Sequence, residues 1–240
     1  MNSEDIIDVN TAKIHYEVYG SGEYIILLHG NGGSTRSFDK QLSAFSSKYT
    51  LVCIDARGQG KSTLGDIKLN IDLLADDVIA VMDHLNIKTA NVIGFSDGGN
   101  VAINLGIRHK KRFTSLIISG ANLFPEGIVS YLKPALELGY LAMKIGSIFS
   151  YKAKVKRELF SLLVKHPHVH PMDLSTINVP VLVLAGERDL ITREHTNLIT
   201  KNIKKSVQYI VKDSDHFIMD EKPDEFNSIV LDYLETVVYR

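Results

Sequence analysis

The sequence predicts a doubly wound α/β fold, in which helices cover both faces of a mostly parallel sheet. Five short runs rich in Val, Ile and Leu recur along the chain, and such runs are typical of strands buried on both faces. Segments of helical period lie between them, an alternation that favours a doubly wound sheet. The runs are YIILLH (24–29), TLVCID (50–55), NVIGF (91–95), TSLIIS (114–119) and VPVLVLAG (179–186).

The two ends of the chain complete this pattern. Residues 5–9 and 12–20 alternate between apolar and polar side chains, which predicts two antiparallel strands at one edge of the sheet. A weaker apolar run, VQYIV (207–211), predicts a further strand. The clearest helical stripe covers residues 70–85, and a closing helix is expected over 222–240, with Pro223 in its first turn.

One long segment interrupts the alternation. About fifty residues after TSLIIS contain no strand-like run, which exceeds the usual length of a connection. Pro134, Gly139 and Gly146 indicate a bent or divided helical element there. We expect a helical lid over residues 121–172, inserted after the strand that ends near Ser119. Residues 1–120 and 173–240 would then form the core of a single domain, with the lid over the carboxyl ends of the strands.

Composition and charge exclude several classes of function. The chain has 27 Lys and Arg against 28 Asp and Glu, so no basic excess indicates a nucleic acid or an anionic membrane as partner. No apolar run approaches the roughly 20 residues of a membrane span, and the acidic N-terminus lacks the pattern of a signal peptide. The one cysteine, Cys53, has no partner for an internal disulfide. We expect a cytoplasmic monomer or homodimer with no membrane or nucleic-acid partner.

A serine stands between glycines where the third apolar run meets a helical segment. Gly94-Phe95-Ser96-Asp97-Gly98 matches G-x-S-x-G in the strand-turn-helix setting that this motif requires. The simplest interpretation is that the glycines make a tight turn and the serine caps the helix. The setting favours a displayed nucleophile instead, because the turn points the hydroxyl at substrate and the helix dipole stabilises developing negative charge.

A serine nucleophile needs a base, and a carboxylate that orients the base. In this architecture the acid and then the histidine follow the serine along the chain. His195 falls in a segment with the pattern of a surface helix, whereas His216 falls in a loop after the final strand, where it could swing over the serine. Glu187 and Asp189 both follow the fifth apolar run, and either could be the acid or a solvated loop charge.

The tetrahedral intermediate of acyl transfer needs two donors for its oxyanion, which are usually backbone N–H groups. The residue after the nucleophile, Asp97, supplies one such amide. The glycine-rich stretch LLHGNGG follows the first parallel strand and supplies a candidate for the other, the amide of Asn31. Glycine-rich loops also cradle phosphate, but neither G-x-G-x-x-G nor G-x-x-x-x-G-K-[ST] is present.

Five motifs, taken in order, carry a resemblance to a known family. They are LLHGNGG, DARGQGKS, GFSDGG, LAGERDLI and DSDHF. From about residue 10 to its C-terminus the chain resembles the α/β-hydrolases of the small, lid-bearing serine esterase type. The resemblance implies that Ser96 is the nucleophile and His216 the base. It implies Asp189 as the acid, by its G-x-x-D spacing from Gly186, and the two amides named above as oxyanion donors.

The neighbourhood of the serine is similar to one branch of this family. GFSDGG followed by SGANLF resembles the valacyclovir hydrolase (biphenyl hydrolase-like) branch, whose substrates are amino-acid esters. If the Asp97 side chain reaches the pocket, it would pair with a substrate ammonium; otherwise it complements the helix dipole. The chain departs from the common family pattern at two positions. Asp215 stands directly before His216, where the family commonly has glycine, and Asp97 stands where the family commonly has Met, Leu or Gln. The DARGQGKS run implies a structural loop behind the site.

The lid composition indicates an apolar roof for a small acyl or aromatic group. Leu141 and Met143 belong to the same stripe, which could alternatively pack on the core. The residues expected to bind substrate are Phe95, Asp97, Leu132, Leu136 and Tyr140.

We therefore expect a serine hydrolase that cleaves small carboxyl esters through an acyl-enzyme, with no metal and no cofactor. The histidines of HPHVHP (166–171) lack the spacing of zinc ligands and are interpreted as part of a connector. The same triad can also serve carbon-carbon bond hydrolysis or perhydrolysis. A small-molecule receptor with vestigial hydrolysis is the alternative from a different class, because fold alone does not determine function.

Overall fold

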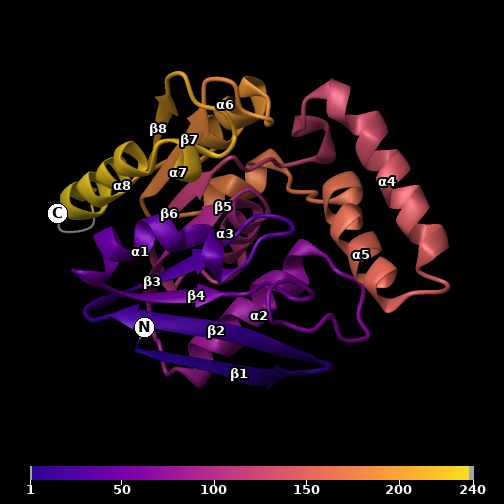
Figure 1. Cartoon of the computed structure of the whole chain (residues 1–240). Helices are drawn as coiled ribbons and strands as arrows, with labels where there is room; N and C mark the ends of the chain where they lie inside the picture. Colours follow the sequence, from indigo (N-terminus) through magenta and orange to yellow (C-terminus); the bar gives the residue numbers. More distant parts are fainter. Residues whose placement is uncertain (1, 238–240) are drawn as a thin grey trace.

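A computed structural model describes residues 2–237, and its centre is an eight-stranded sheet (Figure 1). The strand order is β1-β2-β4-β3-β5-β6-β7-β8. Strands β3 to β8 run parallel to one another, whereas β2 pairs antiparallel with both β1 and β4 at one edge of the sheet. The strands are β1 (Ser3–Val9), β2 (Ala12–Gly20), β3 (Glu23–Leu28), β4 (Tyr49–Ile54), β5 (Ala90–Phe95), β6 (Phe113–Ser119), β7 (Val181–Gly186) and β8 (Ser206–Val211).

Helices cover both faces of the sheet because alternate strand residues point to opposite sides. In β3, Ile26 and Leu28 join one apolar core with residues of α2, α3 and α6, while Ile25 and Leu27 join the other with α1 and α8. This arrangement confirms the predicted doubly wound α/β fold. The helices are α1 (Asp39–Ser46), α2 (Ile71–His84), α3 (Asp97–Arg108), α4 (Lys133–Gly146), α5 (Tyr151–Lys165), α6 (Arg193–Asn202), α7 (Ile218–Glu221) and α8 (Pro223–Val237).

Several short elements were not anticipated from the sequence. Helix α7 has four residues, and one turn is too short to show a periodic pattern. The 3₁₀ turns are η1 (Thr35–Phe38), η2 (Pro125–Gly127), η3 (Ser130–Leu132) and η4 (Pro171–Thr176). The last three residues of the expected closing helix lie outside the described residues. Among the described helices, none combines the length and apolar character needed to cross a bilayer.

The segment between β6 and β7 contains two long helices that stand to one side of the layered core (Figure 1). Helices α4 and α5 are separated by the turn after Gly146, so the element is divided there. Gly139 lies inside α4, where a Cβ atom would come within 2.7 Å of the Phe160 ring, so this glycine permits close packing of α4 on α5. The role of residues 121–172 as a lid, and the division into core and lid, stay predictions.

The loop after β4 is fixed by hydrogen bonds of two buried charged residues, Asp55 and Arg57. One oxygen of the Asp55 carboxylate accepts a hydrogen bond from the Thr35 amide at 2.7 Å, and the other accepts from the Lys61 amide and from His15 Nδ1, both at 2.8 Å. Arg57 is fully buried and donates to both carboxylate oxygens of Asp77. The DARGQGKS run therefore links β2, α2 and η1 beneath the carboxyl ends of the strands.

Candidate active site

Ser96 occupies a strained turn between β5 and α3. Its backbone has φ 54° and ψ −118°, a left-handed conformation that is uncommon for residues other than glycine. Its amide donates to the Ser119 carbonyl at 2.8 Å, and its own carbonyl accepts from the Asn100 amide at 3.0 Å. Strand pairing on one side and the first turn of the helix on the other thus maintain the strain.

The glycines around Ser96 allow backbone segments to approach closely. A Cβ atom at Gly94 would lie 2.2 Å from the Gly98 carbonyl oxygen, and one at Gly98 would lie 2.1 Å from the Leu28 carbonyl oxygen. No side chain fits either position unless the backbone moves. The turn therefore packs directly on the end of β3, which brings Ser96 beside the loop that follows that strand.

His216 lies between Ser96 and Asp189. Its Nε2 is 3.0 Å from Ser96 Oγ, and its Nδ1 is 2.7 Å from Asp189 Oδ1. The imidazole is buried and packs on the Phe95 ring, with 4.9 Å between ring centroids. Since a carboxylate can only accept, Nδ1 carries the proton and Nε2 is free to accept from the serine hydroxyl. This is the arrangement that activates a serine oxygen.

Asp189 is oriented by the backbone of its own loop. Its Oδ1 accepts from the Ile191 amide at 2.8 Å and its Oδ2 from the Gly186 amide at 3.2 Å. Glu187, the other acid of this loop, accepts instead from the Asp213 amide at 3.0 Å. The structure therefore brings Asp189, and not Glu187, to the histidine.

Two features of the His216 region were missed from the sequence. Gly120, directly after β6, has φ +63°, and a Cβ atom there would lie 2.7 Å from His216 Cε1. Asp215 accepts from the Phe217 amide at 2.7 Å, and Glu221 accepts from the Asp215 amide at 2.8 Å. The Asp215 carboxylate therefore bonds within its own loop, while His216 contacts Ser96 and Asp189.

The loop after β3 packs against the nucleophile turn. A Cβ atom at Gly30 would lie 3.0 Å from Ser96 Cβ, so Asn31 follows a residue in contact with the serine. The Gly33 amide closes a turn onto the Gly30 carbonyl at 3.0 Å. Within residues 2–237, no protein acceptor takes the amide N–H of Asn31 or of Asp97. Both amides are therefore free to donate to a substrate oxygen.

His29 supports this loop from below. Its Nδ1 donates to the Gly30 carbonyl at 2.8 Å, and its Nε2 accepts from the Ala56 amide at 3.0 Å. One ring nitrogen donates and the other accepts, so the ring is neutral. Burial lowers the pKa of His29, while its bond to Gly30 acts in the opposite direction.

The Asp97 carboxylate is buried beside the pocket and lies within hydrogen-bonding distance of two side-chain amides. The Asn31 side-chain amide donates to its Oδ2 at 2.8 Å, and the Asn100 amide lies 3.5 Å from its Oδ1. Burial raises the pKa of Asp97, and the hydrogen bond from Asn31 opposes that shift. Asn31 also donates to the Leu159 carbonyl of α5 at 3.0 Å, which ties the loop after β3 to the helical segment.

A pocket of about 390 Å³ opens over these groups. Four of the five predicted substrate-binding residues line it: Phe95, Asp97, Leu132 and Leu136. Tyr140 is not part of its lining, because its hydroxyl accepts a hydrogen bond from Lys165 Nζ at 2.7 Å on an exposed part of α4 and α5. Further apolar lining comes from Ile128, Leu163, Leu190, Ile191 and Met219.

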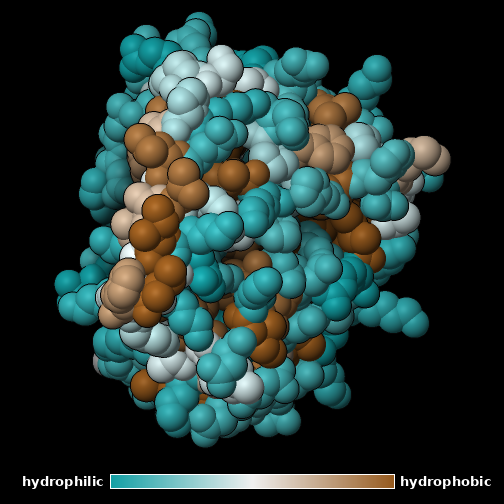
Figure 2. Space-filling view, turned by 90° about the vertical axis from the view of Figure 1, so that its right-hand side faces the viewer, coloured by the Kyte–Doolittle hydropathy of each residue, from teal (hydrophilic) through white to brown (hydrophobic). Residues whose placement is uncertain are grey.

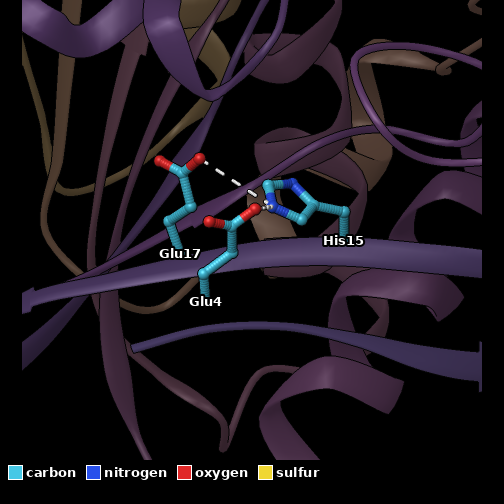
Figure 3. A group of neighbouring side chains, drawn as sticks. All are labelled: Glu4, His15 and Glu17. Atoms are coloured by element: carbon cyan, nitrogen blue, oxygen red, sulfur yellow. Dashed lines mark hydrogen bonds and ion pairs between the residues drawn. The ribbon is translucent and has the colours of Figure 1, made fainter. Parts of the chain in front are cut away.

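Two other groups of titratable side chains lie away from the pocket. His195 belongs to α6, and its Nδ1 lies 3.5 Å from the Leu123 amide, away from Ser96. At the β1-β2 edge, Glu4, His15 and Glu17 come together, with His15 Nε2 3.0 Å from Glu4 and 3.8 Å from Glu17 (Figure 3). The Lys61 ammonium contacts Glu4 and supplies positive charge to this cluster, which lies on β1 and β2 and is separated from β5 by β4 and β3.

A family model described as the alpha/beta hydrolase fold matches residues 23–154, more than half of the chain. The chain belongs to the alpha/beta hydrolase fold family. Curated relatives of this alpha/beta hydrolase include serine hydrolase BPHL of Mus musculus, 27% identical over 95% of this chain and 85% of that protein. They also include 3-oxoadipate enol-lactonase 2 of Acinetobacter baylyi, 26% identical over 95% of both chains.

Solved structures agree with this assignment. The structure titled "Est816 as an N-Acyl homoserine lactone degrading enzyme" superposes with a TM-score of 0.83, at 25% identity, over 95% of this chain and 100% of that chain. The resemblance drawn from the five motifs is therefore confirmed, including the similarity to the BPHL branch. Because the relatives are named hydrolases, the chain is a hydrolase of the alpha/beta fold.

Proposed function

We propose that this protein is a serine hydrolase that cleaves small carboxyl esters through an acyl-enzyme. The observation that carries the proposal is the position of His216, 3.0 Å from Ser96 Oγ on one side and 2.7 Å from Asp189 Oδ1 on the other. The names of the relatives agree with an ester substrate, because lactones are cyclic esters.

In the first half of the reaction, Ser96 Oγ attacks the ester carbonyl and its proton passes to His216 Nε2. Asp189 keeps the proton on Nδ1 and stabilises the imidazolium that forms. The amides of Asn31 and Asp97 donate to the oxyanion. The histidine then protonates the leaving alkoxide as the carbon–oxygen bond breaks, which leaves an acyl group on the serine.

In the second half, water replaces the alcohol. His216 Nε2 takes a proton from the water as its oxygen attacks the acyl carbonyl, and the same amides hold the second oxyanion. Collapse of that intermediate returns the proton to Ser96 Oγ and releases the acid. No group other than the described side chains is needed for proton transfer.

Labelling and turnover test this proposal together. A fluorophosphonate probe should label the wild-type protein and leave Ser96→Ala unlabelled, because only the activated oxygen attacks phosphorus. Hydrolysis of p-nitrophenyl esters should fall by about 10⁴-fold or more in Ser96→Ala. Folded wild-type protein that resists the probe, or that binds ester without multiple turnovers, would favour the receptor alternative.

A second candidate, hydrolysis of amino-acid esters, is favoured by Asp97, a buried acid among the residues that line the pocket. A buried carboxylate attracts a substrate ammonium strongly, since little water screens the pair. The ratio of kcat/KM for an amino-acid ester to that for its des-amino analogue should fall in Asp97→Asn. Burial raises the pKa of Asp97 above the usual value for an aspartate, about 3.9. As the pH falls, the wild-type kcat/KM ratio should therefore begin to decline at a pH above that usual value, because a protonated Asp97 no longer attracts the ammonium.

Using a ratio removes the effect of histidine protonation, which both esters share. An unchanged ratio in Asp97→Asn, with activity on the des-amino ester retained, would contradict ammonium recognition and leave the esterase proposal intact.

A further inference from the structure

Helix α4 is apolar on two opposite faces. One face contributes Leu136 to the pocket and packs on α5 at Gly139. The other carries Leu138, Leu141 and Ile145, which are 68%, 52% and 59% exposed. A spacing of three and four residues places these three side chains on one side of a helix. Helices that are apolar all round are normally buried, but no α4 residue is buried in the described structure.

The exposed stripe continues into the turn between α4 and α5. Ile148 is 75% exposed and Phe149 is 85% exposed, and Tyr151 at the start of α5 is 59% exposed. Figure 2 faces the side of the molecule that carries α4 and α5, and shows hydrophobic side chains gathered into a column among polar ones. We name these six exposed residues the outer surface: Leu138, Leu141, Ile145, Ile148, Phe149 and Tyr151.

The segment that carries the outer surface is strongly basic. Residues 129–165 contain seven Lys and Arg and two acids, a net charge of +5 in a chain whose total is −1. One of the acids, Glu158, is buried and paired with Arg157, so Glu137 is the acid left on the surface. In the described part of the chain, the six lysines of this segment make no ion pair with a carboxylate: Lys133, Lys144, Lys152, Lys154, Lys156 and Lys165, the last of which donates to the Tyr140 hydroxyl.

The position of two lysines opposes helix stability. Lys152 lies in the first turn of α5 and Lys154 follows directly, while no acid occupies that turn. Cations at a helix N-terminus are disfavoured by the helix dipole. The two lysines therefore do not stabilise α5, but they could bind an anionic partner outside the molecule.

We propose that the outer surface docks on an anionic phospholipid membrane. Apolar side chains on a helix flanked by lysines match the interface of such a membrane, which offers an acyl boundary beneath negative headgroups. A second copy of the chain fits poorly, because two segments of +5 charge would repel each other. The total charge of the chain predicts no membrane partner. That total does not show that positive charge is concentrated in residues 129–165. The same two helices line the pocket through Leu136 and Leu163.

Vesicle flotation of the full-length protein tests the proposal. Vesicles of phosphatidylcholine with about 30 mol% phosphatidylserine should carry the protein, and pure phosphatidylcholine vesicles should not. Binding should be lost when salt is raised from about 0.1 M to about 1 M, since the Debye length then shrinks from about 10 Å to about 3 Å.

Two double variants separate the apolar and electrostatic contributions. Ile148→Ser with Phe149→Ser, and Lys152→Glu with Lys154→Glu, should each reduce the partition coefficient by about tenfold or more. The matched control is Lys204→Glu with Lys205→Glu, which reverses two exposed charges in the loop between α6 and β8 and should leave binding unchanged. Circular dichroism of each variant verifies its fold.

Three results would overturn the proposal. They are absence of binding to anionic vesicles at low salt, equal loss of binding in the control variant, and a dimer in solution that the Ile148 and Phe149 changes dissociate while vesicles are ignored. None of these measurements depends on hydrolysis, so they are independent of the proposed esterase activity.

Discussion

At the residue scale, the hydrogen bonds of His216 fix which ring nitrogen carries the proton. Asp189 accepts from Nδ1, and Asp189 is itself held by two backbone amides, so the proton cannot move to Nε2 without losing a buried hydrogen bond. A serine hydroxyl that donates to Nε2 is the partner this tautomer requires. In the proposed mechanism, the ring therefore holds the tautomer needed for proton transfer before substrate binds.

Asp189→Asn should reduce kcat on a p-nitrophenyl ester by about 10⁴-fold, because an amide can stabilise the wrong histidine tautomer. Glu187→Gln, two residues earlier in the same loop, is the matched control. Its side chain accepts from the Asp213 amide and makes no bond to the histidine, so kcat should stay near the wild-type value. Equal effects of the two substitutions would contradict the role proposed for Asp189.

At the element scale, the strand ends bring the site together. Asn31, Ser96, Gly120, Asp189 and His216 follow β3, β5, β6, β7 and β8 within a few residues of each strand's carboxyl end. Parallel strands place these ends at the same edge of the sheet, which is where doubly wound folds bind ligands. Turns and loops then decide which side chain points inward.

Gly120→Ala should reduce kcat by about tenfold or more while the protein stays folded, because the added Cβ would meet the His216 ring at 2.7 Å. Gly58→Ala is the matched control: Gly58 also has a positive φ, of 76°, but its Cβ would meet only Leu64, at 3.3 Å. Both variants should lose roughly 1–2 kcal/mol of stability from the backbone strain. Only the first should lose activity, and similar kcat values for the two would refute this.

The buried pair of Arg57 and Asp77 gives a second prediction for the elements. Asp77→Ala should reduce the free energy of unfolding by about 3–5 kcal/mol, because it leaves a buried guanidinium without its partner. Asp76→Ala, the adjacent residue, removes an exposed pair with Arg108 and should cost about 1 kcal/mol or less. Urea denaturation measures both, and a similar cost for the two would show that Arg57 finds other partners.

At the scale of the whole molecule, burial disfavours the charged form of four histidines: His29 is buried, and His109, His166 and His195 are partly buried. Burial lowers the pKa of His29, His109, His166 and His195. In the unfolded chain these groups titrate near 6.5, so below that pH the unfolded state binds more protons than the folded state. The fold should therefore lose stability as the pH falls below about 6.5.

Urea denaturation between pH 7.5 and 5.5 checks this sign. The nearly fully buried His29 alone should contribute a slope of up to about 1.4 kcal/mol per pH unit below 6.5. His29→Gln should flatten the dependence, whereas His84→Gln removes an exposed histidine from α2 as a control. A stability that rises on acidification over this range would contradict the neutral state of His29.

The sequence alone determined the layered architecture and the order of the chemical groups along it. Apolar runs and helical stripes are local patterns imposed by burial, so the sheet, its antiparallel edge and the serine turn could be predicted before any coordinates. The family resemblance rested on the same short stretches. Residue pattern alone left Glu187 and Asp189 open and the resemblance implied Asp189; the tertiary structure supplied the 2.7 Å contact between Asp189 and His216.

Tertiary structure also decided the hydrogen-bond partners of Asp97, the absence of Tyr140 from the pocket lining, and the exposure of the outer α4 face. Each of these depends on contacts between segments far apart in the chain. Asn31 bonds to Asp97 across 66 positions, and Lys165 bonds to Tyr140 across 25. Side-chain direction on a loop or a partly covered helix is set by such neighbours, and no local pattern encodes them.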